Sequence, residues 1–160
     1  METAGIALGG FMGTGKSTVG ALLAERLKLP FVDLDDVLHE RFGPIPAQFA
    51  SEGEGVFRAR EHALVLELCD GARRVLATGG GVFASRANRL TLRRQYRLVT
   101  LRAPLDVLRQ RVGSGEGRPN WAAAEALYEQ RQDAYASVDL TLDATLSPHQ
   151  LVEEVVTWLG

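Results

Sequence analysis

Residues 10–17 of the chain, GFMGTGKS, match the pattern G-x-x-x-x-G-K-[ST], which is typical of a loop that holds phosphate groups. The stretch 5–9 before it predicts a short buried strand, and apolar residues after it recur with helical spacing. A loop between a strand and a helix presents backbone N–H groups to an anion, and the helix dipole adds to the attraction. Lys16 can then reach the β- and γ-phosphates of a nucleotide, and the Ser17 hydroxyl can hold Mg²⁺. An ordinary glycine-rich turn is the alternative, but all four fixed positions lie in the right strand–helix context, so we interpret the stretch as a phosphate-binding loop.

The remaining strands and helices alternate along the chain, which predicts an α/β protein with a parallel sheet of about five strands and helices on both faces. A length of 160 residues suits one domain, so we expect residues 1–160 to form it. One long helix, with a kink near Gly53, is predicted over residues 47–69. The predicted strands are residues 5–9, 30–35, 74–78, 96–101 and 138–142.

Composition limits which partners and which cellular compartment are expected. A net charge of −2 gives no reason to expect nucleic acid or an anionic membrane as a partner. No apolar run is long enough to cross a bilayer, and the N-terminus lacks the basic and apolar regions of a signal peptide. The one cysteine, Cys69, excludes an internal disulfide and suits a reducing compartment. We therefore expect a cytoplasmic protein.

Two carboxylates, Asp33 and Asp35, end the predicted strand 30–35, at the edge where open α/β sheets place their ligands. Alternate residues of an extended chain share a face, so both carboxylates are expected on the same side. One could anchor a water molecule on Mg²⁺ while the other meets a substrate hydroxyl. Two solvated loop acids are the alternative.

A glycine-rich stretch at residues 113–117, GSGEG, leads into Arg118 and Pro119. So much glycine inside a compact domain predicts a lid, over about residues 113–121, that would carry Arg118 to a bound phosphoryl group. A plain connector is the alternative.

Taken together, these clusters resemble the shikimate kinase family of small P-loop kinases. Their order and most of their spacings agree with the family, so the resemblance covers nearly the whole chain. The matching stretches are residues 10–18, Asp33-Leu34-Asp35, residues 53–58 with Glu61, the glycines 79–81, Arg111 with Arg118-Pro119, and Arg131-x-x-x-Tyr135.

The resemblance implies an ATP-dependent kinase, with Mg²⁺ as its cofactor, that moves the γ-phosphoryl group of ATP to the 3-hydroxyl of shikimate. The catalytic residues would be Lys16, Asp35 and Arg118. Asp33, through water, and Ser17 would hold the metal. The residues implied for ATP binding are Gly13, Thr14, Gly15, Lys16, Ser17, Thr18, Arg111, which would stack on adenine, and Arg118.

The acceptor side is also implied by the resemblance, and the chemistry of the residues agrees with it. Arg58 and Arg131 would bind the carboxylate of shikimate, because a guanidinium group matches a carboxylate with two parallel hydrogen bonds. Glu61, one helical turn after Arg58, could orient that guanidinium. The residues implied for acceptor binding are Asp35, Arg58, Gly79, Gly80, Gly81 and Arg131.

The chain departs from the family pattern after the predicted lid. Trp121 stands in a segment where the family usually has two leucines, and the run from Arg118 to Arg131 is shorter than the family norm. Two alternatives stay open: a related kinase for another small hydroxy acid such as gluconate, and a nucleotide-binding regulator without turnover. A monomer is expected in each case.

Overall fold

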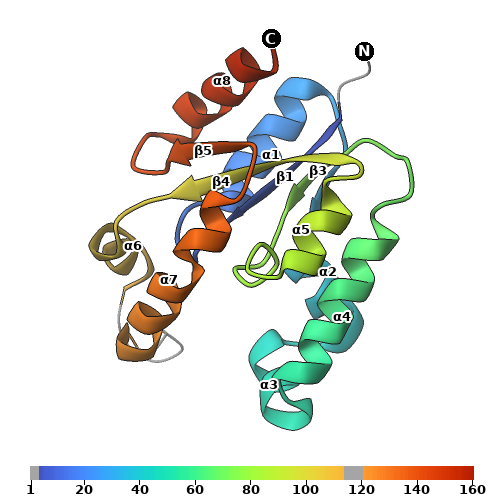
Figure 1. The fold of residues 1–160 in the computed structure, drawn as a ribbon, viewed down its shortest axis with the longest axis vertical. Coiled ribbons are helices and arrows are strands. Elements are labelled where there is room, and N and C mark those ends of the chain that lie inside the picture. The colour runs from blue at the N-terminus through green and yellow to red at the C-terminus, as the bar shows by residue number, and fades with distance from the viewer. Residues whose placement is uncertain (1–3, 114–120) are drawn as a thin grey trace.

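The computed structural model describes residues 4–113 and 121–160, which form a five-stranded sheet flanked by helices (Figure 1). Every pair of neighbouring strands is parallel, and their order is β2-β3-β1-β4-β5. The strands are β1 (Gly5–Gly10), β2 (Phe31–Asp33), β3 (Val75–Ala77), β4 (Tyr96–Arg102) and β5 (Leu140–Asp143). The helices are α1 (Lys16–Leu27), α2 (Leu34–Phe42), α3 (Ile45–Glu52), α4 (Glu54–Glu67), α5 (Arg86–Leu92), α6 (Leu105–Val112), α7 (Trp121–Ala136) and α8 (Pro148–Leu159).

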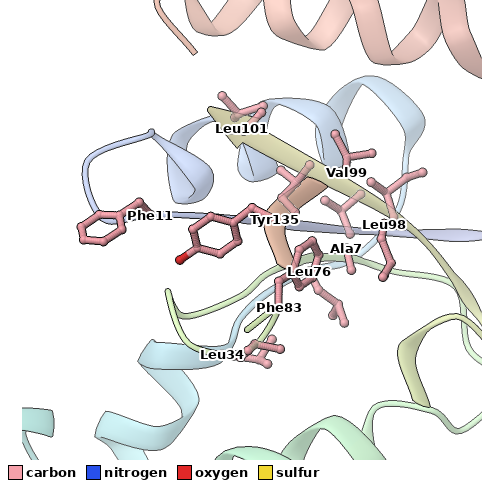
Figure 2. Close-up of a cluster of buried hydrophobic side chains, with 14 of the residues drawn as sticks. Ala7, Phe11, Leu34, Leu76, Phe83, Leu98, Val99, Leu101 and Tyr135 are labelled. Atoms are coloured by element: carbon pink, nitrogen blue, oxygen red, sulfur yellow. The ribbon is translucent and has the colours of Figure 1, made fainter. Parts of the chain in front are cut away.

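The sheet is the middle of three layers. Helices α1 and α8 pack together on one face, and α4 and α5 lie on the other (Figure 1). Buried side chains of the central strands form the core between these layers, among them Ala7 of β1, Leu76 of β3 and Leu98 of β4 (Figure 2). The predicted three-layer α/β fold with about five parallel strands is confirmed.

The second strand is shorter than the sequence predicts, and this moves a candidate site residue. β2 ends at Asp33, whose carboxylate accepts hydrogen bonds from the backbone N–H groups of Asp35 at 3.0 Å and Asp36 at 3.3 Å. Asp33 is therefore the N-cap of α2, a position that aspartate favours. The prediction that Asp33 and Asp35 alternate along one strand was wrong, because Asp35 lies in the first turn of a helix.

The predicted long helix over residues 47–69 is two helices. Gly53 stands between α3 and α4 with a φ of 85°, in the left-handed region that side-chain-bearing residues avoid. The expected kink is thus a complete break. It lets α3 fold back onto α4, where the rings of Phe49 and Phe57 lie 4.8 Å apart.

In the part of the chain that the structure describes, no helix is both long and apolar enough to cross a membrane. Helix α6 ends at Val112 and α7 begins at Trp121, so most of the predicted lid, residues 114–120 with Arg118, lies outside the described residues.

Candidate active site

The phosphate-binding loop connects β1 to α1, as the sequence predicts. Gly13 and Gly15 have φ values of 82° and 90°, which glycine adopts without strain. Gly15 is the N-cap of α1, so no side chain there occupies the first N–H groups of the helix. The first turn of α1 also contains no acidic residue. The loop thus leaves backbone donors and the positive end of a helix dipole directed at one point.

Lys16 lies beneath this loop rather than in solvent. Its Nζ donates a hydrogen bond to the carbonyl oxygen of Gly10 at 2.6 Å. Burial lowers the pKa of Lys16 to about 8, and the nearby carboxylate of Asp35 opposes that shift. The cation is therefore held at the place where a bound phosphate would need it.

Ser17 and Asp33 bring a hydroxyl and a carboxylate together. The Ser17 hydroxyl, in the first turn of α1, donates a hydrogen bond to Asp33 Oδ2 at the end of β2. Oxygen ligands of this kind suit Mg²⁺, which commonly keeps several waters and takes few protein ligands. Within residues 4–113 and 121–160, no group of three or more His, Cys, Asp or Glu side chains could enclose a metal ion. The pair fits a metal that is bound partly by substrate phosphates.

Asp35 is half-buried at the start of α2 and lies against the backbone of Gly79. A Cβ atom added to Gly79 would lie 2.7 Å from Asp35 Oδ1 and 3.3 Å from Glu61 Oε2, so any side chain here would force the Asp35 carboxylate to move. Burial raises the pKa of Asp35, while the Lys16 ammonium lowers it. Asp35 thus links the phosphate loop to the turn that follows β3, although it reaches that place from a helix.

Two arginines approach the next two glycines of the same turn. A Cβ atom on Gly80 would lie 3.2 Å from Arg131 Nη1, and one on Gly81 would collide with the guanidinium of Arg58. Arg131 comes from α7 and Arg58 from α4. The structure therefore gathers side chains from three helices around residues 79–81.

Arg58 is held on several sides. Its Nη1 donates to both carboxylate oxygens of Glu61, at 3.0 and 3.3 Å, and Glu61 is buried. Its guanidinium also lies 5.3 and 5.8 Å from the ring centroids of Phe57 and Phe49. Burial raises the pKa of Glu61, and its pairing with Arg58 opposes the rise. The predicted contact between Glu61 and Arg58 is present. Phe49 was missed, because its spacing in the sequence is that of an ordinary core residue.

Arg111 joins two loops near the phosphate site. Its Nη1 donates to the carbonyl oxygen of Gly13 at 3.3 Å, and its Nη2 donates to that of Ala144 at 2.6 Å, in the turn after β5. The hydroxyl of Thr14 is buried and bonds to Phe11 O at 2.8 Å, whereas Thr18 is exposed on α1. Sequence reasoning did not identify the Ala144 turn, since a backbone carbonyl leaves no signal in residue types.

The carboxyl edge of one parallel sheet thus gathers the groups of this site: backbone N–H donors for a phosphate, a lysine, a hydroxyl–carboxylate pair and two arginines. This fold and site define the chain as a P-loop enzyme of the small-molecule kinase class. The sequence profile of the shikimate kinase family matches residues 12–160, and the chain belongs to that family.

Individual relatives agree with this assignment. A shikimate kinase from Bradyrhizobium diazoefficiens is 39% identical, with 96% of this chain and 78% of that protein aligned. The structure of the Acinetobacter baumannii shikimate kinase in complex with shikimate has a TM-score of 0.90 and 32% identity, and the match covers 98% of this chain and 92% of that one. A gluconokinase structure from Sinorhizobium meliloti has a TM-score of 0.71 and 23% identity, over 98% of this chain and 91% of that one, which shows a shared fold alone.

Proposed function

We propose that the chain transfers the γ-phosphoryl group of ATP to the 3-hydroxyl of shikimate, giving shikimate 3-phosphate and ADP. The observation that carries the proposal is the position of Asp35. This carboxylate lies between the Lys16 ammonium on the nucleotide side and the glycine turn 79–81, around which both carboxylate-binding arginines gather. The family membership and the shikimate-bound relative support the same acceptor.

On the nucleotide side, the backbone of residues 13–18 would bind the phosphates of ATP, with the side chains of Thr14, Ser17 and Thr18 shaping the loop. Lys16 would meet the β- and γ-phosphates, where its charge offsets the negative charge of the transferring group. Arg111 would stack on the adenine ring, after giving up one of its two carbonyl partners.

Ser17 and Asp33 would hold Mg²⁺, Asp33 through a water molecule. Bound there, the ion would supply positive charge that neutralises the phosphate oxygens. The hydrogen bond between the two side chains supports this role, because it places the hydroxyl and the carboxylate together beside the phosphate loop.

On the acceptor side, Arg58 and Arg131 would bind the shikimate carboxylate, and residues 79–81 would lie against its ring. Asp35 would accept a hydrogen bond from the 3-hydroxyl and aim its oxygen at the γ-phosphorus. The raised pKa of Asp35 makes it a better proton acceptor than an exposed aspartate. Phosphoryl transfer depends mainly on such positioning and on charge, which are what these groups would supply.

The remaining parts of the proposal rest on the sequence. Arg118, on a lid of about residues 113–121, would bring a further cation to the γ-phosphoryl group. The chain would act as a monomer in the cytoplasm, as one domain over residues 1–160, without nucleic acid or membrane as a partner.

The test is ADP formation from Mg²⁺-ATP with shikimate or gluconate as the acceptor, with Lys16→Ala as the inactive control. Turnover with shikimate alone supports the proposal. Faster turnover with gluconate would assign a different acceptor. If ADP binds but neither acceptor gives turnover, the chain is a nucleotide-binding regulator and the proposal fails.

A further inference from the structure

Tyr135, near the end of α7, makes a hydrogen bond that the proposed chemistry does not use. Its hydroxyl donates to the carbonyl oxygen of Gly80 at 2.6 Å, and only 1% of the residue is exposed. Figure 2 shows the ring among the core side chains, with the hydroxyl oxygen at the margin of the cluster. A tyrosine buried this deeply normally pairs its hydroxyl, but here the partner belongs to the glycine turn of the acceptor site.

Arg131 lies one helical turn before Tyr135, so the two side chains share a face of α7. A Cβ atom on Gly80 would lie 3.2 Å from Arg131 Nη1 and 3.9 Å from the Tyr135 hydroxyl oxygen, so both groups lie beside the same glycine. Burial raises the pKa of the Tyr135 hydroxyl, and the Arg131 guanidinium opposes this rise.

The chemistry of the two side chains indicates how the Tyr135 hydroxyl is used. Burial raises the pKa of Tyr135, so the hydroxyl keeps its proton at neutral pH and donates it to Gly80 O. The lone pairs of the hydroxyl oxygen are then left for a donor. Arg131 has only donors to offer, and its Nη1 lies close to the same glycine, Gly80. The hydroxyl is therefore placed to accept from the Arg131 cation while it donates to the Gly80 carbonyl.

We propose that Tyr135 is a positioning residue that fixes the Arg131 guanidinium against the turn at residues 79–81, so that recognition of the acceptor's carboxylate depends on the Tyr135 hydroxyl. This inference rests on the proposed function, since it assigns Arg131 to that carboxylate. It adds that the arginine and the glycine turn work as one unit, joined through a group that does not touch the acceptor.

The first experiment compares Tyr135→Phe with Tyr128→Phe, a matched control on the same helix. Tyr128 also donates its hydroxyl to a backbone carbonyl, that of Ala103 at 2.9 Å, away from the glycine turn. Tyr135→Phe should lower kcat/KM for shikimate by about 10- to 100-fold, the range for losing a hydrogen bond that involves a charged group. The loss should fall on the KM for shikimate and leave the KM for ATP unchanged. Tyr128→Phe should leave the KM for shikimate unchanged.

The second comparison uses the methyl ester of shikimate, which has no carboxylate charge for Arg131 to bind. If Tyr135 acts through Arg131, Tyr135→Phe should lower kcat/KM for the ester by less than about threefold, because the ester makes no charged hydrogen bond that the variant could weaken. An equal loss with both acceptors, or no loss with shikimate, would overturn the inference, since a merely structural hydroxyl affects both acceptors alike.

A double-mutant cycle tests the inference without any measurement of turnover. The unfolding free energies of the unliganded wild type, Tyr135→Phe, Arg131→Met and the double variant should be non-additive if the two side chains form one unit. Additive values would overturn the inference, also in a protein that fails to phosphorylate shikimate. Failure of the wild type with shikimate, with a non-additive cycle, would instead reject the proposed function and leave the Tyr135–Arg131 unit standing.

Discussion

The hydroxyl of Ser17 donates a hydrogen bond to the carboxylate of Asp33, and this contact joins the first turn of α1 to the end of β2. The other oxygen of Asp33 caps α2 through the N–H groups of Asp35 and Asp36. One carboxylate thus serves two purposes: it offers an oxygen beside the phosphate loop, and it caps the helix that carries Asp35 to the turn at residues 79–81.

The different roles proposed for Asp33 and Asp35 can be separated by experiment. Asp33→Asn keeps an oxygen that can cap α2, so the fold should survive, but it removes the charge that attracts a cation. We expect it to raise the Mg²⁺ concentration needed for half-maximal activity by about 10-fold or more. Asp35→Asn should instead lower kcat by about 10²- to 10⁴-fold, the contribution typical of a positioned base, with little change in metal requirement. Mg²⁺ titrations of both variants check this, and identical metal dependence would show that the division of roles is wrong.

Lys16 should make nucleotide binding depend on pH. In the unliganded protein its pKa is about 8, so at pH 9 most molecules carry a neutral Lys16. Bound phosphates favour the charged form, so ADP binding at pH 9 should take up close to one proton and weaken about tenfold per pH unit above 8. Calorimetry in buffers of different ionisation enthalpy measures this uptake. Lys16→Arg, which stays charged throughout, should take up none.

The same lowered pKa has a consequence for stability. The pKa of Lys16 in the folded protein lies below the unfolded value of 10.5, so folding disfavours the charged form. The resulting loss of stability is fully present at pH 7, and it disappears as the pH rises from 8 towards 10.5. Lys16→Met should therefore raise the thermal midpoint of the unliganded protein at pH 7, by roughly 2–4 °C. A lower midpoint at pH 7 would contradict the sign of this argument.

The glycine turn offers a steric test. Gly81→Ala places a methyl group against the guanidinium of Arg58, so we expect the KM for shikimate to rise by about 10-fold or more, as when a charged hydrogen bond is lost. Gly55→Ala in α4 is the matched control, because its methyl group would meet nothing within 4 Å. Gly55 is exposed and lies in the first turn of α4, so the substitution should raise stability by at most about 0.5 kcal/mol and have no kinetic effect. Equal kinetics for both variants would show that the turn does not lie against the acceptor.

Arg111 and Arg118 are the two candidates for the cation that stabilises the transition state. Arg118→Ala should lower kcat by roughly 10²-fold or more and leave ADP affinity nearly unchanged, as expected for a charge that acts only when the phosphoryl group moves. Arg111→Ala should weaken ADP binding, since its guanidinium lies at the phosphate loop through Gly13 O. Measuring kcat and ADP affinity for both variants decides between them. Normal kcat in Arg118→Ala, with a collapse in Arg111→Ala, would assign the role to Arg111.

The phosphate loop and the order of strands and helices were determined by the sequence alone. Both depend on residues that are near one another in the chain: the loop on glycines at fixed spacing before Lys16, and the elements on local periodicity. The capping box of Ser147 and Gln150 at the start of α8 is likewise local, since it joins residues three positions apart.

Only the tertiary structure decided which side chains gather at the proposed acceptor side. Asp35 was expected on a strand, but the N-cap contacts of Asp33 outweigh the extended conformation and place it on α2. Arg58, Arg131 and Tyr135 reach the turn at residues 79–81 from two helices, and Arg111 reaches Ala144 from a third. These contacts join residues far apart in the chain, so they depend on strand order and helix packing, which set distances that no local pattern encodes.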